Sequence, residues 1–226
     1  MAIILPDGTK VRFNTTQSKP ISIVDTSNEA PPFATLTGDI PVKTGDVLIV
    51  NQHNWGLLKE VVAVAGQLTD DHKLRLLGHD TSDTFYCEPG EGKGSLCVAS
   101  DWVNLDQVKE ISASGGEMKS YNYTHLDDPT GRERQIPIGT SPVVLTFKPH
   151  YDPDLPWYNA AKRVQFHRQA VVLQLKYPDR TVIYHYGHLS MEGSPTMTIG
   201  QGMQVTVTFS TLCEPVLIPA GQGALS

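Results

Sequence analysis

Short apolar runs separated by turn-forming residues recur in the first half of the chain. Residues 47–50 follow a Gly-Asp pair, residues 61–65 end at Gly66, and residues 74–77 end at Gly78. Brief apolar runs bounded by glycine and aspartate are typical of strands rather than helices. The pattern therefore predicts several short strands over residues 47–99.

Strict alternation of apolar and polar residues marks the second half of the chain. Residues 143–147, 170–177 and 203–210 alternate, and the segment Pro178-Asp179-Arg180 predicts a turn that leads into a partner strand over 181–189. Alternation with period two places one strand face on a core and the other in water or on a polar partner. The polar positions of two of these strands are Gln174, Lys176, Gln204, Thr206, Thr208 and Ser210.

One helix is predicted at about residues 153–167. Asp152 is a suitable N-cap and Pro153 suits the first turn. Trp157, Ala161 and Val164 fall at i, i+4 and i+7, which is one helical face. We expect these three side chains to pack in a core together with Trp102. The fold class is therefore mostly β, with one flanking helix.

The first 45 residues are polar and rich in turn-forming residues, which predicts a loosely structured arm or a run of short strands. The length of 226 residues fits one domain, which we expect to span residues 1–226. The start of the chain lacks the basic and long apolar regions of a signal peptide, and no apolar stretch is long enough for a membrane span. We expect no membrane association.

The formal net charge of −6 and the absence of a basic run argue against a protein that grips nucleic acid. Three cysteines, Cys87, Cys97 and Cys213, have no repeated spacing and are interpreted as buried free thiols.

The chain carries no motif of a catalytic, metal or cofactor site. His185 and His188 are three residues apart on a predicted strand, so their imidazoles lie on opposite faces and cannot share a metal. Residues 88–95 lack the spacing of a phosphate-binding loop and are interpreted as a turn. We expect no enzyme activity, no metal and no cofactor.

Several segments in a fixed order resemble a known family. Residues 101–111, 115–117 and 126–128 come first, followed by the predicted helix, residues 175–182, residues 186–189 and Glu214-Pro215. This ordered set, from about residue 101 to 218, resembles the lambda-type major tail tube protein of long-tailed (siphovirus) bacteriophages. Arg180 stands where the family's turn usually has glycine. We expect no C-terminal immunoglobulin-like domain of the kind that follows the closing strand in some relatives.

The resemblance implies a β-sandwich with a flanking helix, in which strands of the oligomer close a β-barrel lumen. Six copies would form a ring, and stacked rings would form a helical, hollow tube in the virion tail that conducts double-stranded DNA from capsid to host during genome ejection. Its implied partners are copies of itself, a tape-measure protein, a tail terminator and tail tip proteins, with assembly in the host bacterial cytoplasm. The polar faces of residues 174–176 and 204–210 are candidates for the lumen of the tube, or they are ordinary solvent-facing surfaces.

Residues 115–140 form a polar segment too long for a hairpin turn, and such loops are usually functional. We expect it to be a mobile loop that orders against a neighbouring ring. It is separate from the N-terminal arm or elaboration that we expect over residues 1–45. The expected inter-ring or inter-subunit contact residues are Glu117, Tyr121, Leu126, Asp127, Asp128, Arg132 and Arg134.

Two alternative classes remain. One is a related virion or injection-machine component, such as a tail terminator, a baseplate hub or the tube subunit of a type VI secretion system, because one fold serves several such roles. The other is a β-sandwich binding module, which would need exposed aromatic side chains in a groove.

Overall fold

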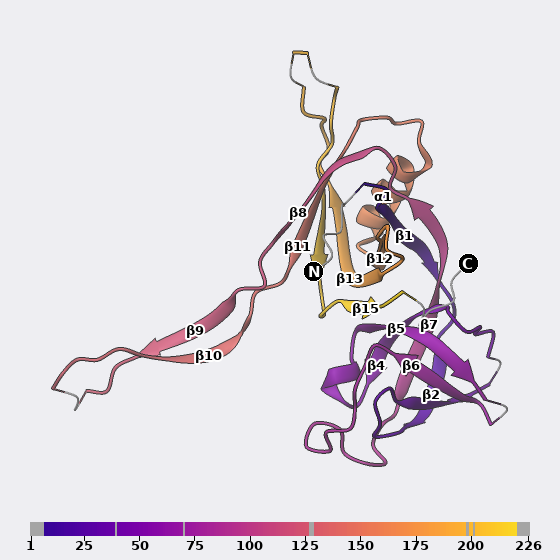
Figure 1. The fold of residues 1–226 in the computed structure, drawn as a ribbon, viewed down its shortest axis with the longest axis vertical. Helices are drawn as coiled ribbons and strands as arrows, with labels where there is room; N and C mark the ends of the chain where they lie inside the picture. The colour runs from indigo at the N-terminus through magenta and orange to yellow at the C-terminus, as the bar shows by residue number, and fades with distance from the viewer. Residues whose placement is uncertain are drawn as a thin grey trace.

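The computed structural model describes residues 7–38, 40–69, 71–126, 129–197, 199–200 and 202–220. Within them the chain is mostly β, as the sequence predicts, with one α-helix (Figure 1). The elements are β1 (Lys10–Gln17), β2 (Ile21–Thr26), β3 (Phe33–Thr37), β4 (Val47–His53), η1 (Gly56–Leu58), β5 (Val61–Leu68), β6 (Lys73–Leu77), β7 (Gly94–Asn104), β8 (Val108–Ser114), β9 (Met118–Tyr123), β10 (Arg134–Thr140), β11 (Val144–Pro149), α1 (Pro156–His167), β12 (Ala170–Lys176), β13 (Val182–Met191), β14 (Val207–Thr211) and β15 (Val216–Ile218).

Six strands close into a barrel in the lower part of Figure 1. Their order is β2-β3-β6-β5-β4-β7, and β7 pairs back with β2 through Ile21 and Leu96. The barrel encloses its own apolar core, which includes Leu36, Leu48 and Leu74. Closure pairs every barrel strand on both sides and so removes exposed sheet edges. The sequence did not predict this closed barrel within a single chain.

Seven strands form a second, open sheet in the order β7-β1-β12-β13-β14-β11-β8, and β15 adds to β13. One face of this open sheet packs against α1 around a core that contains Phe13, Phe147 and Phe209. The alternation read from residues 143–147 and 203–210 matches this face, because Leu145, Phe147, Val207 and Phe209 are all buried in it.

The helix α1 lies on the open sheet through the predicted face, and Trp157, Ala161 and Val164 are all buried. Its start differs from the prediction. Leu155 is the N-cap and Pro156 takes the first helical position, while the Asp152 side chain accepts a hydrogen bond from the Asp154 N–H at 3.1 Å. Asp152 therefore shapes the preceding turn instead of capping the helix.

No helix among the described residues is long and apolar enough to cross a membrane.

The barrel and the open sheet are joined covalently and by packing. Strand β7 pairs with β4 through its first half and with β1 through its second half, so it belongs to both. The outer faces of β4 and β5, with Ile49 and Val62, pack on Val172 and Tyr184 of the open sheet. Strands β4 and β5 are thus buried on both faces, which explains why they read as continuous apolar runs. Trp102 is half-buried beside this contact, with the Arg12 guanidinium 4.8 Å from its ring centroid.

The N-terminal region is a run of short strands. Strand β1 lies between β7 and β12 in the open sheet, and β2 and β3 belong to the barrel. Of the predicted loose arm, residues 1–6 and 39 lie outside the described residues. Of the two predicted alternatives for residues 1–45, the structure has the run of short strands and not the loosely structured segment, because Phe13, Ile23 and Leu36 are core side chains.

The predicted hairpin over residues 170–189 is present as β12 and β13. Arg180 has a φ of 70°, the left-handed conformation that glycine adopts most easily. The Asp179 carboxylate accepts hydrogen bonds from the Thr181 N–H and hydroxyl, both at 2.9 Å. The turn therefore keeps a glycine-like geometry with arginine in the position.

Candidate assembly surfaces

Strands β8, β11, β14 and β13 bring hydroxyl side chains together on the face of the open sheet opposite α1. The register places Ser112, Thr146, Thr208 and Ser190 in one row across the four strands. The next row runs through Ser114, Val144, Ser210 and His188. We call the six hydroxyl residues of these two rows the hydroxyl band: Ser112, Ser114, Thr146, Ser190, Thr208 and Ser210.

The hydroxyl band is partly or fully solvent-exposed in every member. Its two rows contain no lysine, arginine, aspartate or glutamate. Charge appears farther along, where Lys148 pairs with Glu110 at 2.9 Å. The surface can therefore hydrogen-bond water but offers no cationic row to hold phosphate groups.

The predicted polar positions divide into two groups. Gln204, Thr206, Thr208 and Ser210 lie on or beside the exposed face that carries the hydroxyl band. Gln174 is buried, with 2% of its surface exposed, and its amide donates to the Tyr184 hydroxyl at 2.9 Å. Its carbonyl oxygen accepts from the Arg12 guanidinium.

Gln174 is therefore wrong as a candidate for a lumen-facing residue. The alternation was read correctly, but the barrel packs over this part of the open sheet and covers the polar face of β12. Lys176, at the end of the same strand, is exposed.

Residues 117–140 project from the body as a β-hairpin, which we call the arm (Figure 1). Strands β9 and β10 pair only with each other, from Met118↔Thr140 to Tyr123↔Arg134. The segment is therefore not one long structureless loop, because cross-strand pairing reaches Tyr123 and Arg134.

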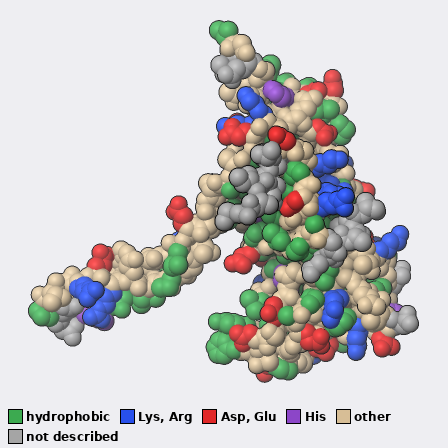
Figure 2. Space-filling view, in the orientation of Figure 1, with side chains coloured by type: hydrophobic (Ala, Val, Ile, Leu, Met, Phe, Trp, Pro, Cys, Tyr) green, Lys and Arg blue, Asp and Glu red, His purple; other side chains and the backbone are tan. Residues whose placement is uncertain are grey.

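Almost every residue of the arm is solvent-exposed, including Glu117, Tyr121, Leu126, Arg132 and Arg134 of the predicted contact set. Asp127 and Asp128 lie outside the described residues. Figure 2 shows hydrophobic side chains along one side of the arm and basic side chains near its far end.

The arm has one apolar face that the sequence analysis did not identify. The register puts Tyr121 opposite Ile136, and the Tyr121 and Tyr123 rings lie 6.4 Å apart and nearly parallel. Ile138, 67% exposed, follows two residues after Ile136 on the same strand. The spacing of Tyr121 with Tyr123 and of Ile136 with Ile138 carried this signal, although polar neighbours hid it.

A pair of glycines forms the base of the arm. Gly115 and Gly116 have φ values of 87° and 76°, and a side chain at Gly115 would collide with the Pro142 carbonyl oxygen. On the returning strand, the Ser141 hydroxyl accepts from the Glu117 N–H at 3.0 Å. The glycines let the chain turn out of β8, and Ser141 holds the two strands together at the bend.

One buried histidine in each region has a strongly lowered pKa. In the barrel, His53 Nδ1 accepts from the Trp55 N–H at 3.1 Å, and burial lowers the pKa of His53 to about 4. In the open sheet, burial also lowers the pKa of His185 to about 4. His188 is exposed on the opposite face, as the spacing predicts.

The described residues contain no group of three or more histidine, cysteine, aspartate or glutamate side chains that could hold a metal ion. Cys87 and Cys97 are buried, Cys213 is half-buried, and burial raises the pKa of all three thiols.

Comparison with protein families matches residues 53–220 to a family model described as phage tail tube protein, TTP. The match covers β5, β6 and β7 of the barrel, the open sheet except β1, the arm and α1.

Two solved structures show a distant likeness. One is the tail of an empty GTA particle, computed with helical refinement in C6 symmetry, at 9% identity and a TM-score of 0.41; it covers 53% of this chain and 87% of that chain. The other is the virion of a native gene transfer agent particle, at 10% identity and a TM-score of 0.39, over 52% of this chain and 88% of that chain. The curated proteins give no match.

Proposed function

The chain belongs to the phage tail tube protein family, and on that premise we propose that its copies close into six-membered rings that stack into a DNA-conducting tube. As a member of this family it is a structural subunit of a tail tube. The proposal adds the ring, the stacking contact and the surface along which double-stranded DNA passes.

The hydroxyl band is the observation that carries the proposal. We assign it to the lumen because hydroxyl groups keep the surface wet and uncharged. A cationic wall would bind the phosphate backbone and retain the DNA, whereas a neutral wall lets it slide. Gln204, Thr206, Thr208 and Ser210 extend this surface, and exposed Lys176 lies toward its margin.

The free edge of β8 supports ring closure by neighbouring copies. Among the described residues β8 pairs only with β11, which leaves its other edge open to a neighbouring copy. Pairing with a neighbour would satisfy these groups and remove the edge, as in any closed barrel.

The arm is assigned to contact between rings. It presents Glu117, Tyr121, Leu126, Arg132 and Arg134 to solvent, and none of the other described strands pairs with it. An isolated two-stranded hairpin is marginally stable in water, so a docking partner would stabilise it. Residues 115–140 thereby act as the stacking element of one functional unit that spans residues 1–226.

The remaining parts of the proposal concern partners and location. The subunit acts without catalysis, and its tube meets a tape-measure protein, a tail terminator and tail tip proteins. The parts are made and assembled in the host bacterial cytoplasm and remain in the virion tail.

Negative-stain electron microscopy of the purified chain, concentrated alone and then with tail tips added, tests the proposal. Uniform hollow tubes with a regular axial repeat and six-fold end views are expected. A monomer that never assembles, or a single ring that does not stack, would contradict it and favour a terminator.

A variant test addresses the lumen directly. Thr146→Arg and Thr208→Arg should leave tube formation intact and slow DNA release from particles, because the new cations would bind phosphate. Lys162→Gln, on the helix side of the open sheet, is the control. Equal release rates in all three would remove the hydroxyl band from the lumen.

A further inference from the structure

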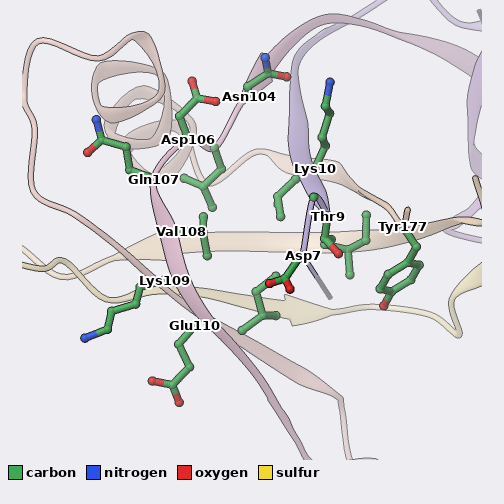
Figure 3. Close-up of a pocket in the computed structure, with 15 residues that line it drawn as sticks. Asp7, Thr9, Lys10, Asn104, Asp106, Gln107, Val108, Lys109, Glu110 and Tyr177 are labelled. Atoms are coloured by element: carbon green, nitrogen blue, oxygen red, sulfur yellow. The ribbon is translucent and has the colours of Figure 1, made fainter. Parts of the chain in front are cut away.

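A groove of about 850 Å³ lies where the start of β1 and the end of β12 meet the connection from β7 to β8. Figure 3 shows Asp7 near its middle, with the side chains of Lys10 and Lys109 pointing away from it. Apolar and aromatic side chains supply much of the lining: Val11, Leu105, Val108, Ile111, Leu175 and Tyr177. Polar and charged side chains, among them Asp106 and Glu110, supply the rest, so the groove is a mixed recess with the Asp7 carboxylate near its centre.

The apolar face of the arm protrudes from the molecule, whereas the groove is recessed. Tyr121, Tyr123 and Ile136 form its middle, and Lys119 lies on the same face because it is two residues from Tyr121 in β9. Tyr121 is 60% exposed and Ile136 is 48% exposed. The face is therefore a protruding apolar ridge flanked by a lysine.

The groove and the ridge are joined by one strand. β8 begins at Val108 beside the groove and ends at Ser114, immediately before the glycine base of the arm. Each copy therefore carries one protruding patch and one recessed patch, linked through β8. Two different complementary patches form a heterologous contact, which repeats from copy to copy and generates rings or helical stacks.

We propose that the apolar face of the arm docks into this groove of a second copy, with Lys119 directed at Asp7. The inference rests on the proposed function, because it names the receiving surface of the stacking arm. The shape match buries Tyr121 and Ile136 against Val108 and Ile111. The charge match gives the contact a polarity that a purely apolar patch would lack.

Cross-linking of assembled tubes tests the contact. A variant with Ile136→Cys on the arm and Ile111→Cys in the groove is treated with a short bis-maleimide and separated on a denaturing gel. A covalent ladder is expected from the tubes of the double variant. Each single variant should remain monomeric, which also controls for Cys87, Cys97 and Cys213.

A matched control replaces the groove position. Phe166 is exposed beside a shallow, mostly apolar recess at the end of α1, away from the groove. Ile136→Cys with Phe166→Cys should give no ladder. A ladder from this pair, or none from Ile136→Cys with Ile111→Cys in well-formed tubes, would overturn the inference.

Charge exchange supplies a second readout that needs no cross-linker. Lys119→Glu should reduce tube growth, and adding Asp7→Lys should restore it, while either change leaves the thermal unfolding of the monomer near wild type. Loss of growth without restoration would contradict the pairing. If the wild-type chain forms no tubes at all, the proposed function fails before this contact is in question.

Discussion

The barrel and the open sheet solve the same problem in different ways. Every barrel strand has neighbours on both sides because β7 pairs back with β2. In the part of the chain that the structure describes, β8 has one neighbour in the open sheet, and the arm pairs only with itself. The barrel is complete within one chain, whereas the open sheet leaves backbone groups that a second copy can satisfy.

Exposed apolar side chains alone do not separate the two regions. The barrel loop after β6 presents Phe85 and Tyr86, which are 85% and 62% exposed. That loop is held by buried Thr81, whose hydroxyl donates to the Ser27 carbonyl oxygen at 2.7 Å, and by buried Cys87. The difference between the regions is the free strand edge, so we place assembly in the open sheet and the arm.

The largest expected effect comes from removing the arm. Replacing residues 117–140 by a short glycine-serine linker should abolish tube formation, because the free hairpin contributes contacts to a neighbour and few to its own chain. The thermal unfolding midpoint of the monomer should change little. Electron microscopy and calorimetry measure the two effects.

The barrel supplies the control for arm removal. Phe85→Ser with Tyr86→Ser removes exposed apolar surface of similar kind and should leave tubes intact. Tubes lost in this variant but kept without the arm would reverse the comparison.

Core truncations compare the two regions in stability. Leu74→Ala in the barrel should cost about 2–5 kcal/mol of unfolding free energy, and Phe147→Ala in the open sheet about 3–5 kcal/mol. Both side chains are fully buried. Because the packing of Ile49 and Val62 on Tyr184 couples the regions, urea should unfold both in one transition.

Tryptophan fluorescence can follow each region separately. Trp55 is buried in the barrel, and Trp157 of α1 is buried between the helix and the open sheet. In a Trp102→Phe background, the Trp157→Phe and Trp55→Phe variants each keep one tryptophan, and the two signals should give the same midpoint. Two distinct midpoints would mean that the regions unfold independently.

A smaller effect is expected from pH, with one buried histidine in each region. The folded pKa values of His53 and His185 are about 4, below the ordinary value of 6.5. Between these values the unfolded chain binds protons that the folded chain does not, so stability falls as pH drops from 6.5 to 4. Each histidine should contribute roughly 1–2 kcal/mol to the loss.

Urea unfolding at pH 7 and pH 4.5 measures this dependence. His185→Leu should reduce this loss of stability, because it removes the group that binds the proton. In the described structure His185 Nδ1 has no hydrogen-bond partner, so the substitution leaves no other polar group unpaired through that atom. His188→Gln, on the exposed face of the same strand, is the matched control. An unchanged loss in His185→Leu would show that this histidine does not titrate on unfolding.

The smallest expected effect is in the turn between β12 and β13. Arg180→Gly should raise the unfolding free energy by about 0.5–1 kcal/mol, because glycine adopts positive φ without steric strain while the unfolded chain gains some freedom. Asp179 and Thr181 keep their hydrogen bonds in this variant. Thermal unfolding of the monomer measures the change, and a fall in midpoint would mean that the arginine side chain stabilises the turn.

Local patterns predicted much of the open sheet. The helix face of Trp157, Ala161 and Val164 and the alternation of residues 205–210 were correct because each depends only on neighbours within the segment. Met203 is exposed and the strand begins only at Val207, so the first part of the predicted strand was wrong. The helix start was wrong by a few residues, since Pro153 and Pro156 both suit a first turn. The turn at Arg180 was also found, although its conformation was not.

Local sequence patterns predicted the candidate assembly surfaces less well. Gln174 alternates as an exposed residue should, yet the barrel covers it, and period two does not report what lies above a face. The apolar face of the arm depends on the register between β9 and β10, which polar composition concealed.

The sequence by itself determined the strand-rich class, the one amphipathic helix, the hairpin after residue 170 and the resemblance to tail tube proteins. These follow from spacing within short segments, where backbone geometry dictates which side chains share a face. The tertiary structure alone decided the closure of the barrel, the burial of Gln174, the hydroxyl band and the pairing of the arm. Each of these depends on contacts between residues far apart in the chain, such as Ile21 with Leu96, and no local pattern specifies such a partner.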